Sequence, residues 1–161
     1  ANDLLSEGIA DAVAALPLLN DLPPGPWVDL GSGSGLPALV FAAAYPAQEV
    51  HLVEARRKRC SFLRAAASAM DLPNVHVHHA RAEDLVAEAG RPRPVLLSAR
   101  AFVAPVELPA RADSWQASHL IVSSSRARLP KEGWPDRWSL HVEHPGRPAP
   151  DRRHLLLVRS A

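Results

Sequence analysis

The chain has 161 residues, enough for one domain with a continuous core, so we expect a single domain over residues 1–161. Lysine plus arginine (18) nearly balance aspartate plus glutamate (17), and the net charge of +1 does not by itself indicate a nucleic-acid-binding protein. One cysteine excludes an intrachain disulfide and a cysteine-rich metal site, and no apolar run approaches the roughly 20 residues of a membrane span; together these features predict a soluble, metal-free, cytoplasmic protein.

The first part of the chain predicts a helix, a strand and a second helix. Apolar residues recur at three- and four-residue spacing over Asn2–Leu19, which predicts an amphipathic helix that ends at the proline-rich residues 20–26. A short apolar strand follows over Trp27–Leu30. After it come a glycine-rich turn and an alanine-rich helix over Leu36–Tyr45.

The same alternation continues along the chain and indicates the fold class. We expect strands over Glu49–Glu54, Asn74–His79, Pro94–Ala99 and His119–Ser123, and helices over Arg56–Met70, Ala82–Ala89 and, less clearly marked, Val103–Trp115. Two final strands, Trp138–Glu143 and His154–Val158, have no helix between them and should pair antiparallel. Because parallel neighbours need long right-handed crossovers, this order predicts an α/β, Rossmann-like fold: a mainly parallel seven-stranded sheet with helices on both faces.

The glycine-rich turn is the clearest sign of a ligand site. Glycines at 31, 33 and 35 follow a strand and precede a helix, where missing side chains let the backbone turn sharply and approach a ligand. Leu36 stands where a dinucleotide fingerprint needs its third glycine, and the Gly-Lys-Ser/Thr of a phosphate loop is absent. The turn instead suits a ligand that carries an ammonium and a sulfonium, with Asp29 orienting the amino group through water or backbone. We therefore predict S-adenosylmethionine as the cofactor, bound by Asp29, Gly31, Ser32, Gly33 and Gly35.

Glu54 is the second candidate cofactor residue. It ends the strand that follows the turn, where a carboxylate can accept hydrogen bonds from both ribose hydroxyls of an adenosine. The alternative is a purely structural carboxylate that pairs with Arg56, Arg57 or Lys58 at the start of the next helix.

Other chemistries are disfavoured by the residues present. Methylation of adenine N6 usually relies on an Asn/Asp-Pro-Pro-aromatic loop after the fourth strand, and Ser98–Phe102 occupies that place. Cys60 lies within a predicted helix beside apolar residues, so we expect packing rather than nucleophilic catalysis. His76, His78 and His79 lack a completing carboxylate or cysteine, and we expect an exposed strand face rather than a metal site.

Four sequence blocks, in this order, resemble a known family. They are Asp29–Pro37 with its Gly-Leu-Pro continuation, Glu54–Arg64 with Lys-Arg-x-x-Phe-Leu-Arg, Arg81–Asp84, and Ser98–Phe102. They are similar to the glucose-inhibited division protein B family (RsmG, GidB), bacterial methyltransferases of small-subunit ribosomal RNA. The resemblance runs from about Leu4 to the closing strand with Arg153-His154-Leu155-Leu156.

The resemblance implies a class I methyltransferase fold and methyl transfer to guanine N7 of 16S ribosomal RNA. Guanine N7 has a free lone pair, so no general base need be encoded, and catalysis would rest on positioning. By the match, Gly31, Leu36, Ala82, Glu83 and Arg100 would contact the cofactor. Arg81 and Arg126 would bind the substrate, and Arg100 and Arg126 would support catalysis. We expect a monomer that acts on ribosomal RNA or on the small ribosomal subunit.

The chain departs from the family pattern in its substrate half. The family has a longer amino-terminal helical region with an Asn-Leu-Thr motif, and this sequence starts after it. Pro94-Val95 replaces an aspartate near the fourth strand, and Ser124-Ser125-Arg126 replaces a lysine-glycine turn after the fifth.

These departures leave alternatives open. Arg81 has a structural reading as a partner of Glu83 or Asp84, and Arg126 as a solvated charge beside Arg128 and Lys131. An enzyme of this class acting on another RNA or a small molecule is the second hypothesis. A cofactor-binding module that has lost catalysis is the third. Fold resemblance alone does not fix the substrate.

Overall fold

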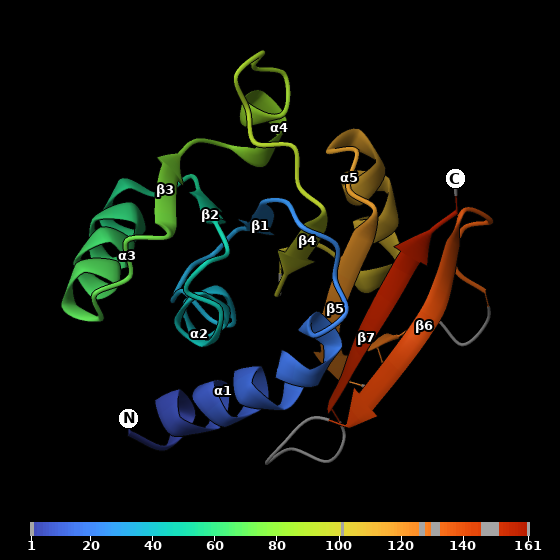
Figure 1. Ribbon diagram of the computed structural model, residues 1–161, viewed down its shortest axis with the longest axis horizontal. Helices are drawn as coiled ribbons and strands as arrows, with labels where there is room; N and C mark the ends of the chain where they lie inside the picture. The colour runs from blue at the N-terminus through green and yellow to red at the C-terminus, as the bar shows by residue number, and fades with distance from the viewer. Residues whose placement is uncertain (1, 101, 126–127, 130–132, 146–151, 161) are drawn as a thin grey trace.

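The computed structural model describes residues 2–100, 102–125, 128–129, 133–145 and 152–160. Within these residues, one sheet has the strand order β3-β2-β1-β4-β5-β7-β6 (Figure 1). The strands are β1 Trp27–Leu30, β2 Val50–Glu54, β3 Val75–His79, β4 Leu96–Ala99, β5 His119–Ser125, β6 Trp138–Pro145 and β7 Arg152–Arg159. β1 to β5 pair in parallel, and β7 lies antiparallel between β5 and β6. The predicted sheet, including its antiparallel carboxyl-terminal pair, is confirmed.

The helices follow the predicted order, and three of them differ from their predicted bounds by more than two residues at one end. They are α1 Asn2–Ala15, η1 Leu16–Leu19, α2 Ala38–Ala44, α3 Arg57–Ala69, α4 Ala82–Leu85, η2 Pro105–Glu107 and α5 Leu108–Ser114. The helix predicted over Asn2–Leu19 is α-helical only to Ala15, and its last four residues form the 3-10 helix η1, which contains Pro17. The helix predicted over Val103–Trp115 is α-helical only from Leu108, and the 3-10 helix η2, which begins at Pro105, precedes it.

The predicted helix over Ala82–Ala89 is much shorter in the structure. Only Ala82 and Leu85 of α4 are buried, and residues 87–90 are exposed. Beyond Leu85 the backbone changes to tighter turns, in which Ala87 bonds to Asp84 and Glu88 to Leu85. An α-helix needs a packed apolar face to persist, and after Val86, which is partly buried against the core, this segment has none.

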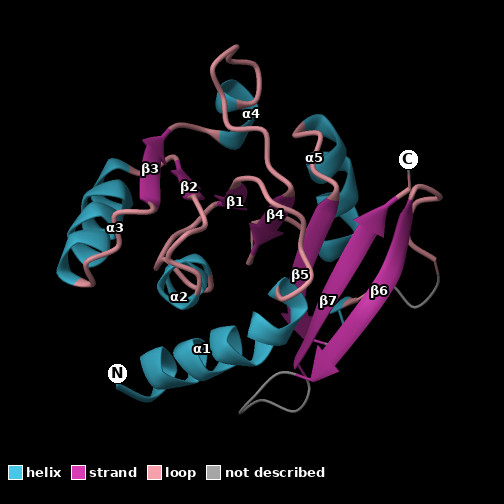
Figure 2. Ribbon diagram, viewed as in Figure 1, coloured by secondary structure: helices cyan, strands magenta, loops and turns pink. Residues whose placement is uncertain are grey.

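Different helices cover the two faces of the sheet (Figure 2). α1, α2 and α3 pack on one face, and α4 and α5 on the other. Strand side chains alternate between these layers: Leu120 and Val122 pack with α5, whereas Ile121 packs with α2. Burial on both faces explains why the central strands are almost continuously apolar.

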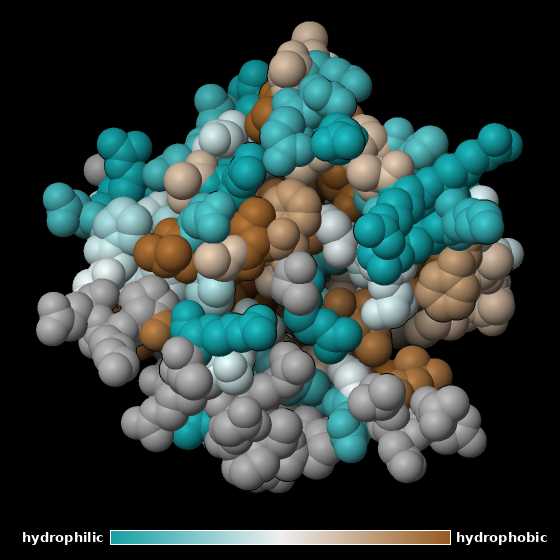
Figure 3. All heavy atoms as spheres, turned by 180° about the vertical axis from the view of Figure 1, so that it is seen from behind, coloured by the Kyte–Doolittle hydropathy of each residue, from teal (hydrophilic) through white to brown (hydrophobic). Residues whose placement is uncertain are grey.

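The outer surface is mixed in character. On the face seen in Figure 3, hydrophobic residues appear in separate patches among hydrophilic ones. No helix of the described segments combines the length and the apolar character that crossing a membrane would need.

Candidate active site

The glycine turn follows β1 and wraps around the carboxyl end of β2. Gly31 and Gly33 have φ angles of +66° and +53°, a backbone region that other residues rarely adopt. The backbone N–H groups of Gly31 and Ser32 both donate to Val53 O, at 2.8 and 3.2 Å. A Cβ built on Gly31 would lie 2.5 Å from the Phe102 ring, so glycine is needed here for space as well as conformation.

Asp29 lies in β1, two residues before Gly31, and its hydrogen bonds link the turn to β4. Its Oδ1 accepts a 2.6 Å hydrogen bond from Ser98 Oγ, and its backbone carbonyl accepts one from Ser32 Oγ at 3.0 Å. The residue is 2% exposed. Burial raises the pKa of Asp29 to about 6, against the opposing effects of the Ser98 and Ser32 hydroxyls and the Arg100 charge. Asp29 therefore holds the turn and β4 together through these two hydrogen bonds, and its role in orienting the amino group of a cofactor stays a prediction.

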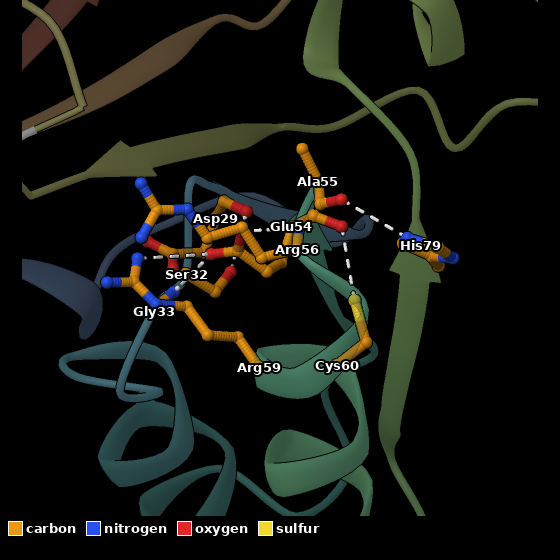
Figure 4. A network of polar contacts seen from close by, with 9 residues as sticks. All are labelled: Asp29, Ser32, Gly33, Glu54, Ala55, Arg56, Arg59, Cys60 and His79. Carbon is orange, nitrogen blue, oxygen red and sulfur yellow. Dashed lines mark hydrogen bonds and ion pairs between the residues drawn. The ribbon is translucent and has the colours of Figure 1, made fainter.

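Glu54 joins the glycine turn to the start of α3 (Figure 4). Gly33 N–H donates to its Oε2 at 3.0 Å, and Arg56 N–H donates to its Oε1 at 2.8 Å. Arg59 Nη1 is the charged neighbour, 3.8 Å from Oε2. Each carboxylate oxygen keeps acceptor capacity beyond these backbone bonds. The structural alternative names Arg56, Arg57 or Lys58 as the charged partner, but the ion-pair neighbour in the structure is Arg59, and Arg56 contributes only its backbone N–H.

A cavity of about 420 Å³, called the first cavity, opens beside this carboxylate. Four residues predicted to bind the cofactor line it: Gly31, Glu54, Ala82 and Glu83. Arg81, predicted to lie nearer the substrate, lines the same cavity. Glu83 pairs with Arg111 at 3.0 Å rather than with Arg81. The structure therefore places Arg81 among residues that were predicted to bind the cofactor.

A second cavity, of about 450 Å³, adjoins the first at Val103, which lines both. Its polar lining comes from Arg100, Ser123, Ser124, Ser125 and Arg128, and its apolar lining includes Leu108 and Val122. Arg100, which the sequence predicts to contact the cofactor, belongs to this cavity. It lies at the carboxyl end of β4, next to the carboxyl end of β5.

α1 and α2 pack closely around the remaining predicted residues. A Cβ on Gly8 of α1 would lie 2.8 Å from Leu36 Cδ1 and 3.8 Å from Arg100 Nη1, so α1 contacts both loops. A Cβ on Gly35 would lie 2.4 Å from Leu39 Cδ1. Gly35 and Leu36 thus shape the turn by packing against helices. Arg126 lies outside the described residues.

A buried hydrogen-bond chain runs from the second cavity to α1. Ser123 Oγ lies 2.9 Å from His154 Nδ1, and His154 Nε2 lies 3.1 Å from Asp11 Oδ1. All three residues are less than 10% exposed, with Ser123 at 8%, His154 at 1% and Asp11 at 5%. A carboxylate only accepts, so Nε2 carries the proton. These hydrogen bonds connect α1 to β7 and to the end of β5.

Comparison with known proteins shows which family the chain belongs to. Residues 1–114 match the family described as GidB, rRNA small subunit methyltransferase G. The chain belongs to this family. It is 38% identical over 141 residues to the ribosomal RNA small subunit methyltransferase G of Sphingopyxis alaskensis, covering 84% of this chain and 58% of that protein. It is 52% identical over 75 residues to the protein of the same name from Granulibacter bethesdensis, covering 47% and 34%.

The chain spans between 26% and 58% of the length of the curated ribosomal RNA small subunit methyltransferase G proteins that it matches. Among solved structures, it is similar to the putative methyltransferase yhhF from Escherichia coli, with a TM-score of 0.68, 20% identity and coverage of 94% and 86%. TrmN from Thermus thermophilus gives a TM-score of 0.67 at 21% identity, covering 92% of this chain and 48% of that one. These likenesses confirm the Rossmann-like class I methyltransferase fold.

The sequence did not indicate several of the residues that line the two cavities. Phe102, which packs on Gly31, and Arg59, which faces Glu54, line the first cavity, while Ser123 and Arg128 line the second. Phe102 had a usable signal, because it closely follows the carboxyl end of a central strand. Ser123 had none, because its partner His154 is 31 residues away.

Cys60 and the histidines show mainly structural roles. Cys60 is buried, and its Sγ donates to Glu54 O at 3.1 Å, which fits the expected packing role. His76 is exposed, but His78 is half-buried because His51 of β2 stacks on both and bonds to His78 at 3.0 Å. Burial, then the charges of His76 and His78, lower the pKa of His51 to about 4, against the opposing effect of Glu49. Within the described segments, no cluster of three or more potential metal ligands is present.

Proposed function

We propose that this chain is an S-adenosylmethionine-dependent methyltransferase that acts on guanine N7 of small-subunit (16S) ribosomal RNA. The observation that carries the proposal is the buried Glu54 carboxylate, fixed by two backbone N–H groups at the edge of the first cavity. The second cavity adjoins it and offers arginines to an anionic substrate. Membership of the rRNA small subunit methyltransferase G family supports the substrate class.

The first cavity fits the chemistry of the proposed cofactor. Ribose hydroxyls need a fixed acceptor, and Glu54 provides one whose orientation the Gly33 and Arg56 backbones set. The first cavity is lined by three arginines and by the carboxylates of Glu54 and Glu83, and a cationic ligand gains where it lies close to these carboxylates. We assign Glu54, Gly31, Ala82 and Glu83 to direct contact, and Asp29, Ser32, Gly33, Gly35 and Leu36 to the shape of the turn.

When bound, S-adenosylmethionine supplies a methyl group on a sulfonium, which an unprotonated ring nitrogen can attack without a general base. The protein therefore has to position the two reactants and exclude unproductive poses. Arg100 lines the second cavity, which shares Val103 with the first, and its charge is suited to hold the RNA there. Arg81 acts at the cofactor cavity, and Arg126 remains a proposed substrate residue.

The direct test measures transfer of labelled methyl from S-adenosylmethionine to naked ribosomal RNA and to small ribosomal subunits. Wild-type protein should label guanine N7. Arg100→Ala should reduce transfer by at least 100-fold and leave cofactor affinity, measured by calorimetry, within about threefold. The matched control is Arg137→Ala, an exposed arginine at the opposite edge of the sheet, beside Ser118 and Arg159.

Three outcomes distinguish the hypotheses. Cofactor binding without labelling of any RNA would contradict the RNA substrate and direct the search to small molecules. No cofactor binding at millimolar concentration would contradict an enzyme and favour a role in assembly. Labelling of guanine N7 that requires Arg100 supports the proposal.

A further inference from the structure

Carboxylates line the first of the two adjoining cavities and are absent from the described lining of the second. Glu54 and Glu83 line the first, together with Arg56, Arg59 and Arg81. Arg100 and Arg128 line the second, and among its described lining residues there is no carboxylate. A cavity with two guanidinium groups and no acid favours an anion, because unlike charges attract most strongly where solvent is partly excluded.

Arg128 carries a charge that the described part of the protein does not neutralise. Arg59, Arg111 and Arg159 each lie within 4.0 Å of a carboxylate, and no such partner of Arg128 is found among the described residues. Arg128 is exposed and lines the second cavity. Its guanidinium is therefore available to bind a phosphate through two N–H groups.

The rest of the second cavity has the features of a nucleotide site. Val103, Leu108 and Val122 give it an apolar wall against which a flat base can pack. Ser123, Ser124 and Ser125 line it from the end of β5, and a serine hydroxyl can both donate and accept. The buried contacts from Ser123 through His154 to Asp11 hold this end of β5 in place. An apolar wall, polar groups and an arginine suit a base with its attached phosphate.

We propose that the second cavity takes the target nucleotide of the RNA and that Arg128 binds a phosphate of that nucleotide or of its neighbour. This assignment rests on the proposed function, because it presumes an RNA substrate. Arg128 then contributes to affinity through charge and not to the choice of base.

The test compares binding of a labelled fragment of small-subunit ribosomal RNA to wild-type protein, Arg128→Ala, Arg128→Lys and the control Arg137→Ala, at several salt concentrations. Arg128→Ala should weaken binding about tenfold at 0.1 M salt. It should also make the slope of log affinity against log salt shallower by about 0.7–0.9, the value for one phosphate contact. Arg128→Lys should retain most of the slope, and Arg137→Ala should match the wild type.

A base-independent effect is the further expectation. Replacing the target guanosine by adenosine should change the affinities of wild type and Arg128→Ala by the same factor. An unchanged affinity and slope in Arg128→Ala, with wild-type methyl transfer intact, would overturn the assignment of Arg128 alone. Wild-type protein that neither binds nor methylates RNA would overturn the proposed function and this assignment together.

Discussion

The two cavities at the carboxyl edge of the sheet are built by different means. The first is built mainly from backbone: three glycines shape its turn, and two backbone N–H groups fix its central carboxylate. The second is built from side chains of β4, of β5, of the segment from Arg100 to α5 and of Arg128, and Ser123 in its lining is bonded through His154 to Asp11 of α1. A site built from backbone can be recognised in the sequence by its glycines. A site built from side chains is harder to recognise, because it depends on which strands lie next to each other in the sheet.

The strongest test of the first cavity is Glu54→Gln. The substituted amide must place its NH₂ group toward the N–H of Gly33 or of Arg56, so a donor faces a donor where an acceptor is needed. We expect affinity for S-adenosylmethionine to fall about 100-fold in calorimetry, with much less change in RNA binding. Glu49→Gln, an exposed carboxylate just before β2, is the matched control. Equal affinities in the two variants would remove Glu54 from the cofactor site.

The second cavity is tested by His154→Ala. This change removes the hydrogen bonds that the imidazole makes with Ser123 and Asp11 in a buried site. We expect the free energy of unfolding to fall by at least about 2 kcal/mol in urea titration, since two buried polar groups lose their bond to the imidazole and each such loss costs about 1–3 kcal/mol. RNA binding should weaken more than cofactor binding. His79→Ala, at an exposed histidine of β3, should change the unfolding free energy by less than about 0.5 kcal/mol.

The smallest expected effect is a pH dependence of cofactor binding. Asp29 has a pKa of about 6, raised mainly by burial, so its carboxylate gains a proton as the pH falls from 7 to 5. Loss of this negative charge disfavours a cationic ligand, and we expect cofactor affinity to fall by up to about tenfold. The arginines of the second cavity keep their charge over this range. Asp29→Asn should bind the cofactor with a flat pH profile; a profile as steep as the wild type's would assign the titration to another group.

Much of the first cavity was predictable because its signals are local. The glycine spacing, the strand ending at Glu54 and the alternation of elements are all properties of short segments. The placement of Arg81 was not predictable in the same way. It depends on how the loop after β3 folds toward Glu54, and on Arg111 of α5 reaching Glu83.

The second cavity was largely hidden from sequence analysis because its contacts are long-range. His154 and Asp11 are 143 residues apart, and they meet only because β7 inserts between β5 and β6. The stacking of His51 on His76 likewise depends on the parallel register of β2 and β3. Helix length was overestimated at α4 because periodicity does not show whether a face finds a partner.

A crystal structure of the chain with S-adenosylmethionine tests the central claim most directly. The account predicts the ribose hydroxyls on the Glu54 carboxylate within the first cavity, with the methyl group directed toward the second cavity past Val103. A cofactor bound instead among Arg100, Arg128 and the serines of β5 would contradict the assignment of the two cavities.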